Sequence, residues 1–445
     1  MSRARIGLVG LVAAVLVAST ACGTDSSGDT VTVLASWTGA EGDAFQKVLD
    51  RFTAETGIEV TYQGTRGLDQ VLSSEVQRGT PPDVALPSPG ELVKYVRSGE
   101  LRPVDGILGQ NPEQAYSEQW LQLQRAGTPQ MYAVAVKADL KSIVWYNPAN
   151  FPGAKPQTWD ELVAAGRERA ASGQAPWCVG MGSPPTSGWP GTDWIEDILL
   201  HQSGSEVYQR WTAGELPWTS DEVRRAWTTW GEIVHEPGVV RGGATAALLT
   251  DFGDAGKPMF AEPQGCAMEH QASFMMSAYQ GFARAGGSPV PVEDFDFFPF
   301  PGFGGGDPAS RPSVVSADLA VMFNDTAPAR ELMKYLASER GQRVWPSIRG
   351  GSAFSVNKRL LKARSPEEEV YRDPVSKRIA ETLTSAGTLC FDASDLMPAT
   401  TRNAFYRAVL EYLGNPDRLD GLLTDLEQVR IGISPDDRFN FPCGR

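Results

Sequence analysis

Short apolar runs alternate with amphipathic helical patterns along the first part of the chain. Val31–Leu34 is a β-branched run, and residues 42–56 carry apolar side chains three or four positions apart. Ile58–Tyr62 and the helical pattern over residues 68–76 repeat this arrangement, and Asp83–Leu86 predicts a third strand. Repeated strand–helix units are typical of an α/β fold with a parallel sheet and with ligand sites at the carboxyl ends of its strands.

Two segments carry the signals of a helix N-terminus. Ser88 and Glu91 flank a proline, and Thr158 and Glu161 have the same spacing. A Ser or Thr hydroxyl and a Glu three residues later can each accept a hydrogen bond from the other's backbone N–H. We therefore expect a capped helix to begin at each place.

Helical patterns dominate the middle of the chain up to about residue 303, after the two strands predicted at Met131–Val136 and Ser142–Tyr146. A strand returns at Val314–Phe323. The remaining expected helices are residues 194–201, 221–234, 271–282 and 327–338, with further helices after residue 354 and a loop at residues 390–398.

These patterns predict two α/β lobes that are joined by several strands, and each lobe is discontinuous in sequence. The first lobe is expected to comprise residues 31–147 and 313–345. The second, richer in helices, is expected to comprise residues 148–312 and 346–445.

The first residues predict export. Arg3 and Arg5 precede the apolar run Ile6–Val17, which is too short to span a bilayer as a helix and is followed by small residues. Ser19-Thr-Ala-Cys22 resembles a bacterial lipobox, so we expect residues 1–21 to be a signal peptide, Cys22 to carry lipid, and residues 22–30 to form a tether on the outer face of the cytoplasmic membrane. The alternative is that Cys22 is incidental and the protein is freely secreted.

Charge argues against nucleic acid as a partner. The 445-residue chain has 40 basic and 54 acidic residues and a net charge of −14. Removal of residues 1–21 takes away two positive charges and leaves −16. Such a chain is repelled by phosphate backbones, and no basic cluster offsets the repulsion.

Four cysteines remain after Cys22, and an even number in an exported chain suggests two disulfides. Spacing leaves three pairings open. We favour Cys178–Cys266 with Cys390–Cys443, since Cys443 lies close to a chain end that would otherwise fray.

Several segments together resemble the family 1 extracellular solute-binding proteins of carbohydrate ABC importers, the maltose-binding-like group. They are Tyr132-Ala-Val-Ala-Val136 with Val144-Trp-Tyr-Asn-Pro148, Thr158-Trp-Asp-Glu-Leu162, Asp296-Phe-Phe-Pro-Phe-Pro301 and Gly350-Gly-Ser-Ala-Phe-Ser355. Three more segments make the chain similar to the α-glucoside-binding branch: residues 176–182 with 188–194, residues 265–274 and residues 391–398.

The resemblance implies a two-lobed clamp of the type II periplasmic-binding-protein kind, with hinge crossovers and a ligand cleft between the lobes. A sugar, which we expect to be an α-glucoside such as maltose, trehalose or sucrose, would close the lobes by contacting both. The closed form would dock on the membrane subunits of an ABC permease. We expect a monomer that requires no cofactor or metal and catalyses no reaction.

A pyranose ring needs polar groups for its hydroxyls and aromatic rings for its apolar face. The first-lobe candidates are Trp37, Glu41, Lys137 and Asp139. The candidates from the rest of the chain are Trp189, Asp193, Trp194, Gln271, Ser273, Trp345, Arg349 and Gly350. Each has a structural alternative, such as a core Trp or a surface ion pair. Asp392, Asp395 and Met397 are interpreted as architectural.

The alternatives to sugar binding are an enzyme, a binding protein for another solute and an adhesive lipoprotein. A glycoside hydrolase needs only two carboxylates, but the common nucleophile, zinc and phosphate motifs are missing, and His201, His235 and His270 are scattered. The same fold could bind a glycerophosphodiester, a polyamine or a peptide. A phosphate ligand would require several cations, of which the sequence nominates only Lys137 and Arg349. A third alternative is a lipoprotein that serves adhesion or wall interaction without transport.

Overall fold

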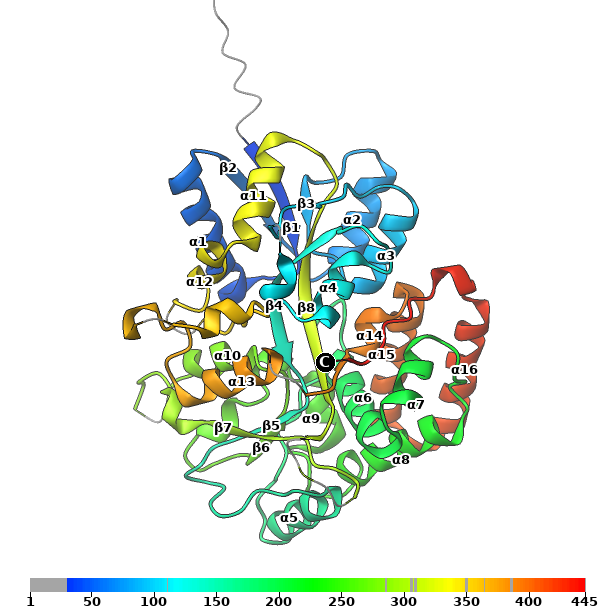
Figure 1. Cartoon of the computed structure of the whole chain (residues 1–445). Coiled ribbons are helices and arrows are strands. Elements are labelled where there is room, and N and C mark those ends of the chain that lie inside the picture. Colours follow the sequence, from blue (N-terminus) through cyan, green and yellow to red (C-terminus); the bar gives the residue numbers. More distant parts are fainter. Residues whose placement is uncertain are drawn as a thin grey trace, which may run out of the picture.

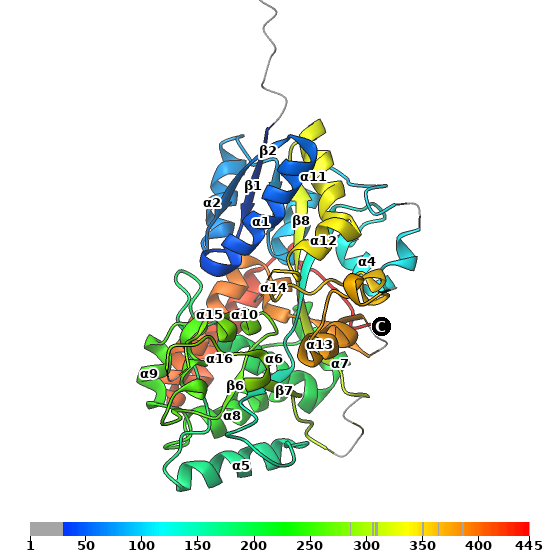
Figure 2. The same ribbon diagram turned by 90° about the vertical axis from the view of Figure 1, so that its left-hand side faces the viewer.

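The computed structural model describes residues 30–444 except 110, 285, 305, 306, 308, 309, 349, 350, 364, 385 and 386. The predicted signal peptide and Cys22 lie outside the described residues. The chain forms two lobes, one above the other in Figure 1 and again in the view turned by 90° (Figure 2). This is the two-lobe clamp that the sequence predicts.

A six-stranded sheet organises the first lobe, the upper one in Figure 1, in the order β2-β1-β3-β8-β4, with β9 paired to β8. Only part of it is parallel: β1 pairs in parallel with β2 and β3, but β8 runs antiparallel to β3 and β4. The parallel pairing predicted from the first strand–helix units is confirmed for β1, β2 and β3, whereas β8 departs from it because the chain enters β8 from the second lobe. The strands are β1 (Thr30–Ala35), β2 (Glu59–Gly64), β3 (Val84–Ala85), β4 (Ala133–Leu140), β8 (Ser313–Met322) and β9 (Leu389–Phe391).

Amphipathic helices surround this sheet. The longest of them buries Phe45, Val48, Leu49 and Phe52, whose spacing of three or four residues places them on one face. The helices are α1 (Gly39–Thr56), α2 (Leu68–Gln77), α3 (Pro89–Arg97), α4 (Glu118–Arg125), α11 (Ala327–Ala337), α12 (Glu339–Val344) and α13 (Pro374–Thr384).

The second lobe has a small antiparallel sheet in the order β6-β5-β7 and a helical core that is rich in tryptophan. The strands are β5 (Ile143–Tyr146), β6 (Met268–His270) and β7 (Asp296–Pro299). The helices are α5 (Trp159–Ala171), α6 (Trp189–Ser203), α7 (Ser205–Thr212), α8 (Asp221–Val234), α9 (Gly243–Leu249), α10 (Met275–Gly281), α14 (Ala393–Leu396), α15 (Ala399–Gly414) and α16 (Leu419–Gly432). The helix predicted from residue 271 begins only at Met275, because β6 and a loop precede it.

The chain crosses between the lobes where β4 leads into β5, and the hydroxyl of Ser142 at this point accepts a hydrogen bond from the backbone N–H of Val314. A later segment stays with the first lobe: Phe354 bridges to Ala138, and the N–H of Lys358 donates to the carbonyl of Ala115. The lobe boundary proposed at residue 346 stays a prediction.

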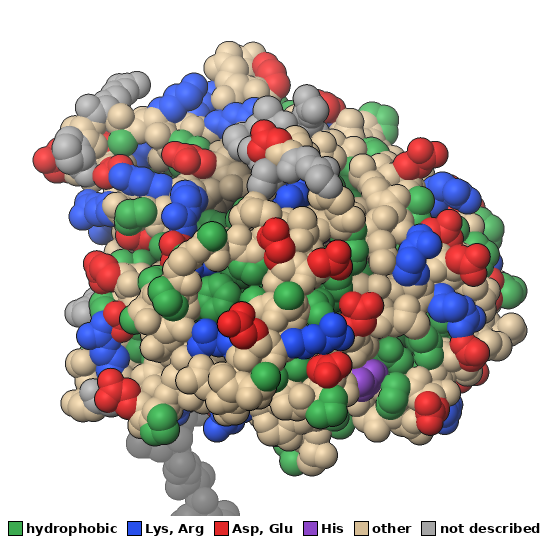
Figure 3. Space-filling model, turned by 90° about the horizontal axis from the view of Figure 1, so that it is seen from below, with side chains coloured by type: hydrophobic (Ala, Val, Ile, Leu, Met, Phe, Trp, Pro, Cys, Tyr) green, Lys and Arg blue, Asp and Glu red, His purple; other side chains and the backbone are tan. Residues whose placement is uncertain are grey.

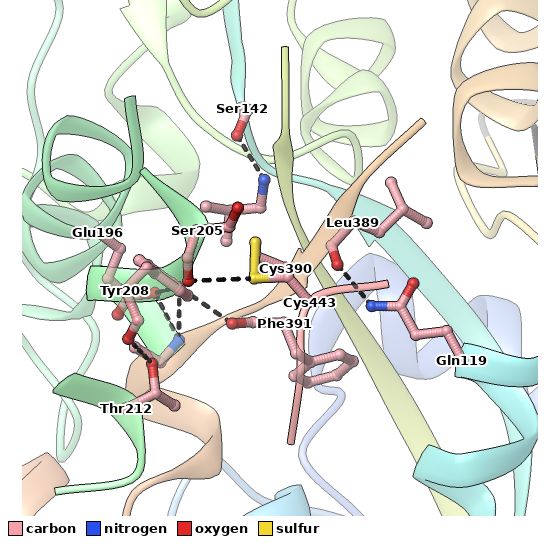
Figure 4. Close-up of a disulfide and its surroundings, with 12 residues drawn as sticks. Gln119, Ser142, Glu196, Ser205, Tyr208, Thr212, Leu389, Cys390, Phe391 and Cys443 are labelled. Carbon is pink, nitrogen blue, oxygen red and sulfur yellow. Dashed lines mark hydrogen bonds between the residues drawn. A yellow bond between two sulfur atoms is a disulfide. The ribbon is translucent and has the colours of Figure 1, made fainter. Parts of the chain in front are cut away.

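Both predicted disulfides are confirmed: Cys178–Cys266 and Cys390–Cys443, with Cα–Cα distances of 5.4 and 4.3 Å. Figure 4 shows how the second bridge ties the C-terminal segment to β9. The side chain of Gln119 donates to the carbonyl of Leu389, and the Tyr208 hydroxyl donates to that of Phe391. Strand β9 is therefore held by helices of both lobes.

The two expected helix caps differ. Thr158 and Glu161 form the predicted capping box at α5. Ser88 makes no side-chain cap for α3; its hydroxyl accepts a hydrogen bond from the Arg402 guanidinium instead. The cap was a wrong prediction because α15 supplies a charged donor that competes for this hydroxyl.

The described helices include none with both the length and the apolar character that a bilayer crossing requires. Seen from below, the second lobe presents interspersed acidic and basic side chains (Figure 3). This face offers no gathered basic surface for a phosphate backbone.

Candidate functional site

A cavity of about 220 Å³ lies between the lobes. The segments that follow the carboxyl ends of β1 and β3 border it from the first lobe, and the N-terminal turn of α6 borders it from the second. Its charged lining residues are Glu41, Asp69, Asp139, Asp193, Asp318, Asp395, Arg66, Lys137, Lys141 and Arg402. Its rings come from Trp37, Trp189, Phe252, Phe274 and Tyr406.

Strand β4 and the residue directly after it carry three alternate charged residues, Lys137, Asp139 and Lys141, and all three line the cavity. Alternate residues of a strand share a face, so a single extended segment presents all three. The sequence analysis named the first two and missed Lys141. The same two-residue period, continued one step further, could have identified it.

Glu41 and Lys137 form the centre of the first-lobe network. The Lys137 ammonium lies 2.9 Å from one Glu41 oxygen and 3.4 Å from Asp139, and Arg66 lies 3.3 Å from the other Glu41 oxygen. Burial opposes ionisation of Glu41, yet Lys137 and Arg66 lower its pKa below the usual value. Glu41 is thus a carboxylate at neutral pH.

Three aromatic rings surround the Lys137 ammonium. Its nitrogen lies 5.9, 5.3 and 5.7 Å from the ring centroids of Trp37, Phe274 and Trp345. Trp345 packs edge-on against Trp37 with 4.7 Å between centroids and lies behind it, outside the lining of the cavity. Trp345 therefore supports Trp37 rather than bordering the cavity itself.

The loop after β1 holds Trp37 in place. The Tyr62 hydroxyl donates to the Trp37 carbonyl over 2.7 Å. A Cβ at Gly64 would lie 2.1 Å from that same carbonyl oxygen, so the close approach of β2 requires glycine. Trp37 is 2% exposed, so its neighbours cover almost all of its side chain.

Lys141 is the centre of the second-lobe network. Its ammonium lies 3.0 Å from Asp193 and also contacts Asp392. Burial would lower the pKa of Lys141, but these carboxylates raise it well above its usual value. Lys141 and the N–H of Asp395 in turn lower the pKa of Asp392. Glu196 completes the group by accepting the backbone N–H groups of Ala393 and Ser394.

Oxygens of Asp193, Glu196 and Asp392 lie within 4.8 Å of one another, a grouping that could hold a cation. The Lys141 ammonium already provides positive charge to two of them. His201 and His270, expected to be scattered, both contact Asp197 in the core below, at 2.8 Å to its carbonyl and 2.7 Å to its carboxylate. His270 thus connects β6 to α6, whereas His201 and Asp197 both belong to α6.

The two tryptophans of α6 differ in position. Trp189 is half-buried, lines the cavity and packs against Phe252 and Phe274 at 5.0 and 5.9 Å. Trp194 is 2% exposed and packs against Trp177 in the tryptophan-rich core. The cleft role predicted for Trp194 is corrected accordingly, since its ring lies on the core side of the helix.

Two other predicted site residues, Ser273 and Gln271, are buried and do not line the cavity. Ser273 is buried and donates to Asp139 over 2.9 Å, so it orients a cavity carboxylate without lining the cavity. Gln271 is buried outside the lining, and its carbonyl accepts a hydrogen bond from the Trp145 indole. Arg349 and Gly350 lie outside the described residues.

Two contacts join the lobes at the cavity rim. Arg402 of α15 pairs with Asp69 of α2, and the Arg66 guanidinium lies 5.3 Å from the centre of the Phe252 ring. None of these four residues was predicted as a site residue, because the partners in each pair lie 186 or 333 positions apart in the sequence. No local pattern carries that information.

Two lobes joined by crossing strands, with a polar and aromatic cavity between them, define a solute-binding protein of the clamp type. The chain belongs to the bacterial extracellular solute-binding protein family, whose profile matches residues 36–343. It is accordingly an exported, non-enzymatic component of an ABC transporter.

Two curated relatives match nearly the whole chain. The alpha-glucosides-binding periplasmic protein AglE of Rhizobium meliloti is 33% identical over 89% of this chain and 86% of its own length. The osmoprotective compounds-binding protein GgtB of Synechocystis sp. is 34% identical over 92% of this chain and 95% of its own. The resemblance predicted from the sequence is confirmed.

Solved structures agree on the fold. The bacterial solute receptor AcbH aligns with a TM-score of 0.73 at 17% identity, covering 90% of this chain and 97% of its own. A chitin oligosaccharide binding protein aligns with a TM-score of 0.72 at 19% identity, covering 91% and 99%.

Proposed function

We propose that this protein captures a neutral sugar, an α-glucoside such as maltose, trehalose or sucrose, and delivers it to the membrane subunits of an ABC permease. The observation that carries the proposal is the composition of the interlobe cavity. Ring edges and faces of Trp37 and Trp189 lie beside carboxylates and ammonium groups. This combination suits a ligand with an apolar ring face and a rim of hydroxyls.

The proposed ligand contacts are the nominated residues that line the cavity: Trp37, Glu41, Lys137, Asp139, Trp189 and Asp193. They come from both lobes, so a ligand that touches them favours the closed form. The charge pattern does not favour a phosphorylated ligand, because each of the four cations lining the cavity among the described residues already has a carboxylate partner.

The name of AglE supports the α-glucoside assignment. The name of GgtB, which is similar over as much of the chain, favours a second candidate, an osmoprotective compound. A neutral osmoprotectant that carries hydroxyls would use the same groups. The ligand screen below includes both classes.

We also propose that residues 1–21 are removed and that Cys22 carries the lipid anchor of a monomer, as the basic flank, apolar run and lipobox-like segment suggest. Fractionation of cells that express the full chain tests this anchor. Recovery of the protein in the membrane fraction is expected, and recovery in the culture medium alone would contradict it.

A thermal-shift screen tests the proposed ligand class. Maltose, trehalose, sucrose and the neutral polyol sorbitol, with glucose 6-phosphate as control, are each added to the purified protein. A ligand at one hundred times its Kd stabilises the folded state by about 2.7 kcal/mol and raises Tm by several degrees. The proposal would be excluded if glucose 6-phosphate alone raised Tm, or if none of the neutral sugars raised it.

A further inference from the structure

Two cavity carboxyl groups differ from all the other charged groups of the cavity. Glu41, Asp69, Asp139 and Asp193 each contact a cation, and each of the four cations contacts at least one of them. Asp318 and Asp395 also line the cavity, but within the described parts of the chain neither carboxyl group makes a hydrogen bond or an ion pair. The six acidic and four basic lining residues give a formal charge of −2, which equals the charge of these two carboxylates.

The two groups are carried by different elements, β8 and α14. Asp318 lies on β8 opposite Lys137 of β4, in the first-lobe sheet. Asp395 lies on α14, and its backbone N–H donates to Asp392 over 2.8 Å. Since Asp392 is in turn bound by Lys141, the segment that carries Asp395 is fixed to the second-lobe network.

A carboxylate withdrawn from bulk water without a partner is unfavourable, so folded proteins satisfy such groups. Asp318 and Asp395 are only partly buried, so water fills this role in the empty cavity and a ligand that enters can replace it. An ionised carboxylate only accepts hydrogen bonds, and two oxygens can take bonds from two adjacent hydroxyls of a sugar.

We propose that Asp318 and Asp395 are the specificity-determining acceptors for the ligand's hydroxyl groups, and that the ligand bridges the first-lobe sheet and the segment fixed to the second-lobe network through them. This inference rests on the proposed function and deepens it. It assigns to Asp395 a ligand contact where the sequence suggested an architectural role, and it adds Asp318, which the sequence analysis did not name.

A cationic ligand fits this geometry less well than a neutral one. The Lys137 ammonium already lies over Trp37 and Phe274, and the Lys141 ammonium lies 5.6 Å from the centre of the Trp189 ring. These resident cations repel an incoming ammonium. Hydroxyl groups meet no such repulsion.

Protonation provides an independent test. Burial raises the pKa of both carboxyl groups to about 7. The charged groups that act on them are Lys137, Asp139, Glu41 and Asp395 for Asp318, and Asp392, Lys141, Arg402 and Asp69 for Asp395. Hydroxyl donors favour the ionised form and lower the pKa in the complex. Affinity is therefore complete above about pH 7 and falls as the pH is lowered through that value.

The experiment measures binding by isothermal titration calorimetry, with the sugar of the maltose, trehalose and sucrose panel that the wild type binds. Asp318→Asn and Asp395→Asn should each weaken binding at least tenfold at pH 8, and Asp425→Asn, at an exposed position on α16, should not. Wild-type affinity should fall about tenfold from pH 8 to pH 5.5, with proton release on binding at pH 6.5. The double variant should lose this pH dependence.

Each outcome decides the matter. Variants that bind the sugar with wild-type affinity and pH dependence overturn this inference and leave the proposed function standing. A wild type that binds none of the sugars overturns both. If spermidine binds and the variants lose it, the two carboxylates hold a cation and the inference is wrong. If either variant fails to fold, the proton release of the wild type decides.

Discussion

Lys137 and Lys141 lie four residues apart along β4 and the residue directly after it, yet the charges around them differ. The partners of Lys137 border the cavity: the side chain of Glu41 is 15% exposed and is shared with Arg66, which is 30% exposed. The partners of Lys141 are more deeply buried: Asp193 lines the cavity but is 3% exposed, and Asp392 is fully buried.

This difference in burial indicates that the network around Lys137 takes part in binding and that the network around Lys141 supports the site. A network with a second cation and some access to solvent can exchange partners when a ligand enters. A more deeply buried network cannot, because each buried charge depends on a single arrangement of partners. We infer that the second lobe supplies a fixed platform and that the first-lobe network adjusts to the ligand. Three predictions test this contrast, from the largest expected effect to the smallest.

The largest effect concerns Glu269, a dry carboxyl group of the second lobe. It is 1% exposed, and the Tyr279 hydroxyl donates to it over 2.8 Å. Burial raises the pKa of Glu269 to about 8, so the folded state holds a proton that the unfolded chain releases above its ordinary value near 4.5. The contribution of Glu269 to the free energy of unfolding is complete below pH 4.5, and it is lost as the pH rises towards 8.

Glu269→Gln should remove this loss. Between pH 5 and pH 8.5 the variant should gain on the order of 4 kcal/mol over the wild type in free energy of unfolding, since each pKa unit corresponds to ~1.4 kcal/mol. Urea unfolding at the two pH values measures the gain. Glu113→Gln, an exposed first-lobe position, is the matched control. Equal pH slopes for the wild type and Glu269→Gln would show that the second lobe is not dry at this point.

The two lysines themselves give the second prediction. Lys141→Met leaves Asp193 and Asp392 buried without their cation and should lower the free energy of unfolding by about 3 kcal/mol. Lys137→Met should lower it by only about 1 kcal/mol, because Glu41 keeps Arg66, Asp139 keeps the Ser273 hydroxyl as a donor, and a methionine fits among the surrounding aromatic rings. Denaturant unfolding at pH 7 compares the variants. A Lys137→Met variant as unstable as Lys141→Met would remove the contrast between the networks.

The sequence predicted the elements better than their orientation. Local periodicity located α1 and α8, and strand ends located Trp37 and Glu41 at the cavity, because the carboxyl ends of strands carry the ligand loops of α/β folds. The direction of β8 depends on where the chain re-enters the first lobe, which no local pattern encodes.

The residues that the sequence missed depend on long-range register. A shift between Ala135 and Lys137 sets which residues of β4 and β8 face each other, and it places Asp318 at the cavity. Arg402 reaches Asp69 and Ser88 across more than 300 positions. Contacts of this kind follow from packing of the whole fold and not from any window of the sequence.

The tryptophans of α6 show how a small error in an element's start changes a site. The sequence placed the helix start at Trp194, whereas α6 begins at Trp189. Five residues along a helix turn the side-chain direction by about 140°, so the two rings face nearly opposite sides. With the start misplaced, both tryptophans remained candidates for the cavity.

The third and smallest effect concerns Trp189 and Trp194, whose rings face nearly opposite sides of α6. Trp189→Leu should weaken sugar binding about tenfold, or about 1.4 kcal/mol, and leave Tm nearly unchanged, because the half-buried ring borders the cavity. Trp194→Leu should lower Tm and leave the affinity unchanged, since its ring packs against Trp177 in the core. Thermal unfolding and calorimetric titration of both variants distinguish the two roles. If the two substitutions exchanged effects, with affinity lost at Trp194 and Tm lost at Trp189, the assignment of the second lobe as a fixed platform beneath the ligand would fail.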